Sequence, residues 1–473
     1  MRPVSAIVAS TLLLSACALQ PVPQRGEIVS AALPAETTIP AGWTASDARS
    51  EVRSGWLRDF HDPALDAIVN EALAHNPDLR VAAEQVRIAR QYVVLAGAGI
   101  LPQLGAQVGA QNIRDKDADR NFDSARAMLG MAWELDVWGR LRSQRSAAVF
   151  GAEAAALDYR YARESLAALV AKSWYLTLAS RELVELAEQT VETFQKLLEL
   201  VEVRRKSGKD SDLNVMNVRA KVATARSDLA SAQSAYAQSR RTLEILLGRY
   251  PSAEISVSEG SPTLSELEGV GVPLALLGRR PDIAAAERTA LAAFRMQESA
   301  RLSLLPDVSF SLSGGRLNDQ VLSLLRLNPW LAIADIGLSI PIYTGGALQA
   351  NVEIASAQQA QAIANYGASV LGAFEDVENA LAGEQFLQSQ LNFEEAALTD
   401  RTEVVRIADT QYRAGKRDLL WVAQLQSAEF LTAASVIKLR SARIMNRIDL
   451  YLALGARFEE TSSPESSLEQ RSP

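Results

Sequence analysis

The feature that most constrains the fold of this chain is a long internal repeat. Asn76-Pro-Asp-Leu79 is echoed by Arg280-Pro-Asp-Ile283, and Ile100-Leu-Pro102 by Leu304-Leu-Pro306, both at an offset of 204 residues. Two further pairs follow at an offset of 207, namely Arg205-Lys-Ser-Gly208 with Tyr412-Arg-Ala-Gly415 and Leu246-Leu-Gly248 with Ala453-Leu-Gly455. This period is far longer than that of solenoid repeats. The sequence therefore predicts a duplicated unit, with copies at 56–249 and 279–455 joined by a linker at 250–278.

Each copy is predicted to begin with a helix and to continue with two strands. The helices are expected at 63–98 and 281–302, where apolar residues recur at helical spacing. Apolar and polar residues then alternate with period two, which indicates strands with one apolar and one polar face. The alternating stretches are 103–111, 125–137, 308–313 and 334–342.

Long helical stretches follow the strands in both copies. The stretch 143–206 contains no proline and would extend roughly 95 Å as a helix. Its counterpart is 347–413, and shorter helices are expected at 212–247 and 418–454. Helical patterns of this length are typical of coiled coils, repeats or membrane spans, and the charges along them exclude a span. We therefore expect an array of long helices packed through small residues.

The N-terminal residues predict export. A single charge at Arg2 precedes a short apolar run, which is the pattern of a signal peptide over 1–16. Leu14-Ser-Ala-Cys17 resembles a bacterial lipobox, which implies lipidation of Cys17; the alternative is a plain signal peptide with an incidental cysteine. Ala18 follows, not aspartate, and by the sorting rule of enteric lipoproteins this favours the outer membrane. The segment 17–55 is expected to be an extended tether, and 456–473 a disordered tail.

Composition removes several classes of function. The net charge of −8 argues against a nucleic-acid-binding protein. One cysteine and two histidines leave little material for metal sites or catalytic triads. Arg279, Arg280 and Asp282 are interpreted as the start of a helix and not as a catalytic cluster, because Pro281 suits a first helical turn. We expect no enzyme activity, no metal site and no cofactor apart from a covalent lipid on Cys17.

The four alternating stretches pose a problem of closure. No stretch approaches the ~20 apolar residues that a membrane helix needs. An open sheet cannot lie in lipid, because its unpaired backbone groups cost several kcal/mol each. Since outer-membrane barrels have about eight or more strands, two chains would supply eight strands and three chains twelve. Aromatic residues lie near the expected strand ends, where interfacial aromatics occur: Trp133, Trp138, Trp330 and Tyr343. On pattern alone, the alternative is the edge of a soluble β-sandwich.

The connections between the paired strands are predicted to be exposed loops, at 114–123 and 314–329. In the first loop, Asp115, Asp117 and Asp119 imitate the beginning of a calcium-binding loop. Arg120 stands where that loop requires glycine, and Arg126 where it requires glutamate. We therefore reject a calcium site here.

Several motifs, in order along nearly the whole chain, resemble signatures of outer-membrane efflux proteins of the TolC/OprM type. With the lipobox, the match is to the lipoprotein, NodT-like branch of that family. The motifs are Trp133-Glu-Leu-Asp-Val-Trp-Gly-Arg-Leu141, Leu277-Gly-Arg-Arg-Pro-Asp-Ile283, Pro341-Ile-Tyr-Thr-Gly-Gly346, the stretch from Tyr366 to Leu381, Tyr412-Arg-Ala-Gly415 and Leu450-Tyr-Leu-Ala-Leu-Gly455.

The resemblance implies a mixed α and β membrane protein that forms a homotrimer. Its four strands per protomer would build one twelve-strand barrel in the outer membrane, and its long helices a periplasmic coiled-coil tunnel. A periplasmic adaptor and an inner-membrane transporter, often of the resistance-nodulation-division class, would be its partners, with outer-membrane lipid around the barrel. The chain itself would be a passive, lipid-anchored conduit.

The resemblance also places functional residues. The turns between the long helices would be the periplasmic tips that meet the adaptor, with Gly208, Lys209 and Asp210 in one and Gly415, Lys416 and Arg417 in the other. Family members narrow the tunnel just beyond the second turn, often with an aspartate ring. Leu420 and Gln424 fall on these constriction positions, so we expect an aperture controlled by sterics and hydrogen bonds. The alternative is that Gln424 is an ordinary surface residue of a coiled coil.

Three hypotheses for the function follow. The first is export of drugs or other small toxic compounds. The second keeps the same architecture but uses it for type I protein secretion or metal efflux. The third, from a different class, is a lipoprotein coiled-coil scaffold without a pore, which would not need the four alternating strands.

Overall fold

The computed structural model describes residues 19–46, 50–115, 120–257, 260–265, 267, 269–319 and 330–459. These residues divide into two compact units. The first holds the described residues up to Thr37 with Ala83–Asp158 and Asp282–Ser369, and the second holds Thr38–Ala82, Tyr159–Pro281 and the described residues from Val370 onward. The predicted signal segment 1–16 and Cys17 lie outside the described residues.

The duplication is visible element by element. Four pairs of elements have equal lengths: α4 (Pro77–Ala98) and α8 (Pro281–Leu302) with 22 residues, β1 (Gln103–Asp115) and β3 (Asp307–Asp319) with 13, α5 (Arg140–Lys206) and α10 (Ala347–Arg413) with 67, and α6 (Asp212–Leu246) and α11 (Leu419–Ala453) with 35. The first two pairs begin 204 residues apart and the last two 207 apart, as the sequence motifs predict. The additional residues of the second copy therefore lie between the start of β3 and the start of α10.

The helix predicted over 63–98 is in fact two helices, α3 (Pro63–His75) and α4, which are separated at Asn76. Pro77 has no amide hydrogen and disfavours helical backbone at the preceding residue, so Asn76 is extended, with ψ of 127°. The Asn76 side chain stabilises this break by accepting a hydrogen bond from the Leu79 N–H at 3.0 Å and donating one to the Leu246 carbonyl at 2.9 Å. Arg280 forms the equivalent break between α7 (Pro273–Arg279) and α8.

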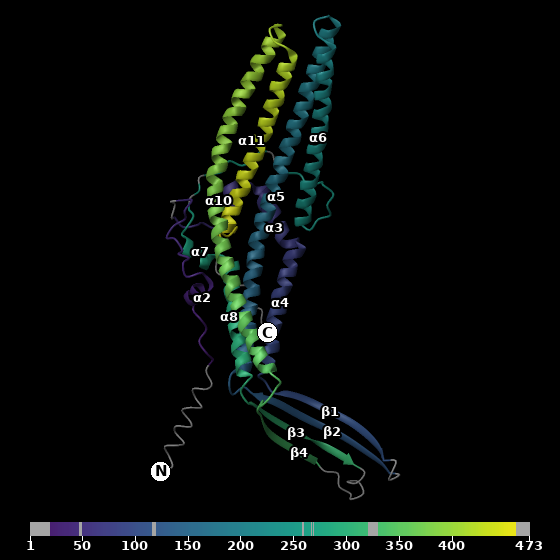
Figure 1. Ribbon diagram of the computed structural model, residues 1–473. Helices are drawn as coiled ribbons and strands as arrows, with labels where there is room; N and C mark the ends of the chain where they lie inside the picture. Colours follow the sequence, from purple (N-terminus) through teal and green to yellow (C-terminus); the bar gives the residue numbers. More distant parts are fainter. Residues whose placement is uncertain are drawn as a thin grey trace. The chain divides into compact units, whose positions relative to one another are not determined.

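The strands form one antiparallel sheet in the order β1-β2-β3-β4, which Figure 1 shows as four neighbouring ribbons. β2 spans Arg120–Leu135 and β4 spans Trp330–Ser339. The predicted loops at 114–123 and 314–329 are too long. Asp115 pairs with Arg120 across the ladder, and β3 continues to Asp319, because backbone pairing extends beyond the alternating apolar residues. Residues 116–119 and 320–329 lie outside the described part of the chain.

An aromatic core organises the second unit. Trp56, at the start of the 3-10 helix η1 (Trp56–Phe60), stacks on Tyr451 with ring centroids 5.8 Å apart. The indole of Trp174 donates a 2.8 Å hydrogen bond to Asp62, the residue that caps α3. Residues 250–278 are more than the linker that the sequence predicts, because Ile255 and Val257 are buried in this core.

The segment 17–55, predicted to be an extended tether, is instead packed over its described residues. In the first unit it forms the short helix α2 (Arg25–Ala32), and Arg25 makes a 2.7 Å ion pair with Glu287 of α8. The Ala32 carbonyl lies so close to Gly367 of α10 that a Cβ at Gly367 would be 2.4 Å from the oxygen.

The same segment is fastened again in the second unit. The indole of Trp43 is buried and donates a 3.0 Å hydrogen bond to the Val270 carbonyl. The Glu378 carboxylate accepts the N–H groups of Thr44 and Ala45 at 2.7 and 3.0 Å. Apolar burial and charge-assisted hydrogen bonds therefore hold a stretch whose composition suggested a loose chain.

The beginning of the predicted disordered tail is also ordered. Phe458 is buried, and its N–H donates to Glu164 at 3.0 Å, while residues 460–473 lie outside the described part. Within the described residues, no helix is both long enough and apolar enough to cross a membrane.

Candidate functional site

The first candidate surface is the apolar face of the sheet. The registers place Leu104, Met131, Leu312 and Ala334 in one row across the four strands. A neighbouring row joins Trp133, Phe310 and Ile336. Ile336 is 78% exposed and Leu104 is 83% exposed, so this face is not covered by the rest of the chain. Exposed apolar rows of this kind fit contact with lipid.

The opposite face of the sheet is mostly polar or small. One of its rows joins Gln103, Ala132, Ser311 and Asp335. The Ser311 hydroxyl lies 3.4 Å from the Asp335 carboxylate, and Glu134 makes an ion pair with Arg140. This face fits contact with water. Within the described residues, β1 and β4 each lack a partner strand on their outer side.

Tryptophans lie near the ends of the strands, as predicted. The indole of Trp133 donates to the Ile100 carbonyl at 2.8 Å, and that of Trp138 to the Pro306 carbonyl at 2.7 Å. Trp330, at the start of β4, is 71% exposed. These side chains present an apolar ring and a bonded or solvated N–H, the combination that suits a membrane interface.

The second candidate surface comprises the turns between the long helices. Gly208 and Gly415 both have positive φ, 70° and 74°, which ends α5 and α10 in the same way. In each turn the following lysine N–H bonds back to the helix, Lys209 to the Arg204 carbonyl and Lys416 to the Gln411 carbonyl, both at 2.9 Å. The two predicted turns are therefore equivalent in backbone conformation.

Asp210 connects the two hairpins, a role that the sequence did not predict. Its carboxylate accepts hydrogen bonds from Asn214 Nδ2 at 2.6 Å and from the Tyr412 hydroxyl at 3.2 Å. The Arg204 guanidinium lies 3.7 Å from the same carboxylate and 4.7 Å from the centre of the Tyr412 ring. Because the residue at the equivalent position of the second copy is Arg417, this cluster has no counterpart there.

Tyr412 is buried, and burial raises its pKa to about 12. The Arg204 guanidinium opposes this shift, while the carboxylate of Asp210 adds to it. The phenol therefore stays protonated and remains a donor to Asp210 at any physiological pH.

Leu420 and Gln424 lie one turn apart near the start of α11. Neighbouring Leu419, Val422 and Ala423 are buried in the core between the hairpins, whereas Leu420 is half-buried and Gln424 is exposed. The constriction at Leu420 and Gln424 therefore stays a prediction. These two residues lie on a face of α11 that the rest of the described chain leaves partly exposed.

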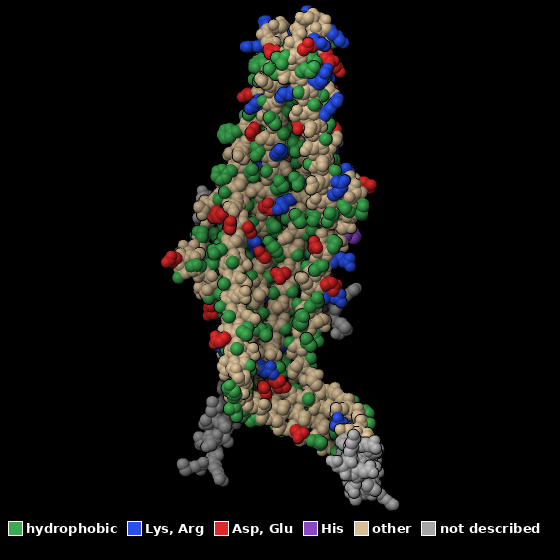
Figure 2. All heavy atoms as spheres, turned by 45° about the vertical axis from the view of Figure 1, so that its right-hand side comes forward, with side chains coloured by type: hydrophobic (Ala, Val, Ile, Leu, Met, Phe, Trp, Pro, Cys, Tyr) green, Lys and Arg blue, Asp and Glu red, His purple; other side chains and the backbone are tan. Residues whose placement is uncertain are grey.

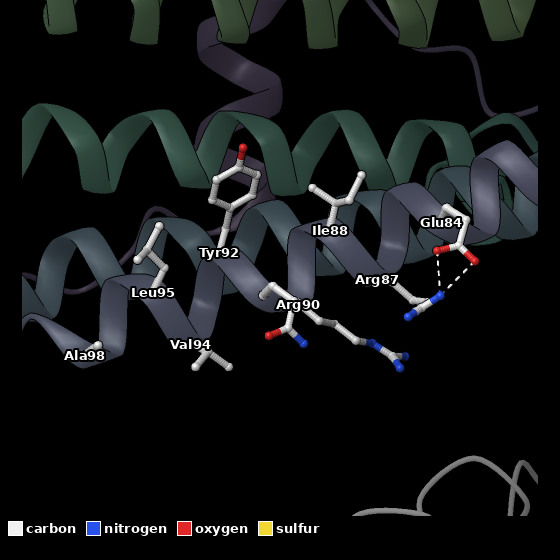
Figure 3. Close-up of a pocket in the computed structure, with 9 residues that line it drawn as sticks. Glu84, Arg87, Ile88, Arg90, Tyr92, Val94, Leu95 and Ala98 are labelled. Carbon is white, nitrogen blue, oxygen red and sulfur yellow. Dashed lines mark hydrogen bonds and ion pairs between the residues drawn. The ribbon is translucent and has the colours of Figure 1, made fainter.

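A third surface, on α4, was missed. Ile88, Tyr92 and Leu95 project from one side of this helix and are each more than half exposed, beside a shallow groove of 820 Å³ (Figure 3). Their spacing of four and three residues is that of a coiled-coil seam. This spacing was present in the sequence and could have shown a helix face that needs a partner.

Within the described residues, no group of three or more His, Cys, Asp or Glu side chains could hold a metal ion. Cys17, the predicted lipidation site, lies outside those residues.

Comparison with known families decides among the functional classes. The model of the outer membrane efflux protein family matches residues 68–249 and, separately, 272–456. The chain belongs to the outer membrane efflux protein family. The two matched ranges correspond to the two copies, and the family consists of transport conduits, not of enzymes.

Relatives and solved structures agree with this assignment. The efflux protein is 30% identical over 446 residues to the pyoverdine export outer membrane protein OpmQ of Pseudomonas putida, covering 89% of this chain and 93% of that one. It is 29% identical over 456 residues to the cation efflux system protein CusC of Escherichia coli, covering 95% and 97%. A structure of CusC matches with a TM-score of 0.79 at 28% identity, over 93% of this chain and 100% of that one. The outer-membrane channel OprN matches with a TM-score of 0.80 at 25% identity, covering 90% and 98%.

Proposed function

We propose that this efflux protein is the outer-membrane conduit of a tripartite system that exports drugs or other small toxic compounds. The observation that carries the proposal is the four-stranded sheet, which has one exposed apolar face, one polar face and, over the described residues, two edges without a partner strand. A chain with such a sheet can reside in lipid only if its edges are paired.

Three copies supply this pairing. Joining β4 of one copy to β1 of the next closes a twelve-strand barrel, and twelve lies within the even-numbered range of outer-membrane barrels. The uncovered face of α4, with Ile88, Tyr92 and Leu95, gives neighbouring copies a helical contact as well. The protein is thus proposed to be a homotrimer whose polar sheet face lines the lumen.

The partners follow from family membership and from the equivalent turns. A periplasmic adaptor is proposed to dock on the turns at Gly208–Asp210 and Gly415–Arg417, and an inner-membrane transporter of the resistance-nodulation-division class to supply the energy. Lipidation of Cys17 is proposed to anchor the chain to the outer membrane. The first described contacts after this residue are the packing of Leu19 toward Gly139 and the 3.0 Å hydrogen bond from the Gln20 N–H to Glu298.

Leu420 and Gln424 are proposed to narrow the tunnel. A neutral amide at this position gives no ring of negative charge, so passage is controlled by sterics and hydrogen bonds. Gln424→Asp in planar bilayers should shift single-channel selectivity toward cations and introduce block by divalent cations. Unchanged selectivity and block would place the constriction elsewhere.

One specific alternative to drugs as the cargo is metal cations. Similarity to the cation efflux protein CusC is nearly equal to the similarity to OpmQ, so metal efflux is the second candidate. Protein secretion keeps the same architecture, but the relatives described above are named for pyoverdine export and cation efflux.

A deletion strain tests the proposal and separates these cargos. It should become sensitive to several unrelated drugs and retain more of a fluorescent dye, and wild-type protein should restore both. Cys17→Ser should restore them less well. Sensitivity confined to metal salts would assign the conduit to metal efflux. If a strain that lacks this protein and its paralogues is no more sensitive than the wild type to drugs or to metal salts, the proposal is contradicted.

A further inference from the structure

The two hairpin ends carry a surplus of positive charge on an acidic protein. Residues 204–212 and 409–418 contain seven Lys or Arg and four Asp, whereas the whole chain has a net charge of −8. Figure 2 shows Lys and Arg side chains gathered around the ends of these hairpins.

The four aspartates at these ends are already engaged within the chain. Asp210 is bound by Arg204, Asn214 and Tyr412. The other three are held by neighbouring side chains, Asp212 by Arg205, Asp409 by Arg413 at 2.8 Å and Asp418 by Asn214 at 3.3 Å. Their negative charge is therefore largely compensated locally.

Three lysines at the same ends are in a different situation. Lys206, Lys209 and Lys416 are exposed, and none of them makes an ion pair or side-chain hydrogen bond with another described residue. Lys206 is the last residue of α5, Lys209 follows Gly208 and Lys416 follows Gly415, so all three lie at the hairpin ends. The unpaired lysine ammonium group at each hairpin end is available to form an ion pair with a carboxylate of another molecule.

Apolar side chains accompany the lysines. Val203, at the end of α5, and Leu213 and Met216, in the first turns of α6, are each more than half exposed. An apolar centre with a charged rim is typical of protein–protein interfaces. A purely polyanionic partner, such as the cell-wall polymer, would make no use of these three side chains.

We propose that the hairpin ends form a basic docking surface for a protein partner whose contacting segment carries Asp or Glu side chains beside apolar ones. The inference rests on the proposed function, in which a periplasmic adaptor docks at these turns, and it adds the chemistry of the adaptor's contacting segment. Lys206, Lys209 and Lys416 form the charged rim, and Val203, Leu213 and Met216 the apolar centre. Because screening limits such attraction to about 8 Å at physiological salt, the lysines act at close range.

The first step of the test identifies the contacting segment. A photo-reactive amino acid is placed at Ser207 or Ala414 in the full-length protein in cells, and cross-linked peptides are read by mass spectrometry. We expect an adaptor peptide that contains acidic residues. A cross-linked adaptor segment without Asp or Glu would overturn the inference and leave the proposed function intact. Absence of any adaptor among the products would overturn both.

The second step measures binding of that adaptor to the purified protein in detergent. The variant Lys206→Glu, Lys209→Glu, Lys416→Glu should bind at least about tenfold more weakly, and wild-type affinity should fall as salt rises. The matched control Arg226→Glu, Arg241→Glu, Lys438→Glu makes the same change in charge at exposed positions of α6 and α11, and should bind as wild type.

A third variant keeps the test independent of folding. Replacing the same three lysines by arginine preserves the charge and should preserve binding. Equal affinity of the wild type and the glutamate variant would overturn the inference. So would lysine-dependent binding to purified peptidoglycan with charge-independent binding to the adaptor, which would assign the lysines to the cell wall.

Discussion

The hydroxyl of Tyr412, in the last turn of α10, donates a 3.2 Å hydrogen bond to the carboxylate of Asp210, in the turn between α5 and α6. This hydrogen bond therefore joins a residue of the second copy of the duplicated unit to a residue of the first copy at the hairpin ends. The Arg204 guanidinium over the Tyr412 ring adds a second contact between the copies. These interactions couple two turns that are otherwise separate in sequence.

We predict that Tyr412→Phe loosens both turns. A hydrogen bond to a charged group contributes about 1.5–3 kcal/mol, so local opening should become at least about tenfold more frequent. Amide hydrogen exchange over 207–216 and 411–420 measures this opening. Tyr250→Phe, at an exposed tyrosine, is the control. Equal exchange in the wild type and Tyr412→Phe would show that Asn214 and Arg204 hold Asp210 without the phenol.

The pH dependence of this contact follows from the pKa of Tyr412. Burial raises this pKa to about 12, above the ordinary tyrosine value of about 10. The neutral phenol is therefore favoured in the folded state, and its contribution is complete below about pH 10 and is lost as the pH rises through about 12. The tyrosinate absorbance difference between the wild type and Tyr412→Phe should appear near pH 12. A difference centred near pH 10 would contradict the burial.

Much of the fold could be predicted from local patterns. The bounds of α10 and α5 depend on helical periodicity, on glycine after the last turn and on the absence of proline, which are all local features. The predicted range 347–413 therefore equals α10, and the predicted range 143–206 differs from α5 by three residues at its start. The strand stretches were located by alternation, but their ends were not. The ladder continues to Asp115 and Asp319 through backbone pairing, which side-chain hydropathy does not report.

Most of the errors have a common physical cause, which is long-range packing. The break at Asn76 is the exception, because Pro77 marks it in the local sequence and only its hydrogen bond to the Leu246 carbonyl is long-range. The composition of 17–55 predicts a tether, but Trp43 is buried and Glu378 accepts the N–H groups of the following residues, Thr44 and Ala45. The role of Asp210 depends on Tyr412, 202 residues away. No local window of sequence contains such partners.

A glycine pair tests the packing of the N-terminal segment. A Cβ at Gly367 would lie 2.4 Å from the Ala32 carbonyl oxygen, whereas one at Gly372, in the same helix, meets nothing within 4 Å. We predict that Gly367→Ala displaces the segment at 25–33 and makes it susceptible to limited proteolysis. Gly372→Ala should leave cleavage unchanged, since alanine stabilises a helix by up to about 1 kcal/mol relative to glycine. The same cleavage pattern in both variants would refute the close approach.

Glu378 should hold the next part of this segment. Its carboxylate accepts two backbone N–H groups, so Glu378→Ala removes both charge-assisted bonds and leaves the donors at Thr44 and Ala45 without this acceptor. We predict faster amide exchange at residues 43–46 and unchanged exchange at the hairpin ends. Glu375→Ala, at an exposed position three residues earlier, is the matched control. If both variants exchange alike, then the burial of Trp43 and the hydrogen bond from Gln385 to the Ala45 carbonyl fix the segment without Glu378.

The sheet gives the sharpest test of membrane contact, because its two faces predict opposite outcomes. Leu129 is 69% exposed on the apolar face and lies between Ala106 and Gly314, whereas Gln107 lies on the polar face of β1. In the proposed barrel, arginine at position 129 would meet lipid at a cost of up to about 2–4 kcal/mol, while arginine at position 107 would face the lumen. We therefore predict that Leu129→Arg sharply reduces the heat-modifiable trimer recovered from outer membranes, whereas Gln107→Arg assembles normally and changes only channel selectivity. The reverse result would assign the apolar face to the lumen and invert the proposed barrel.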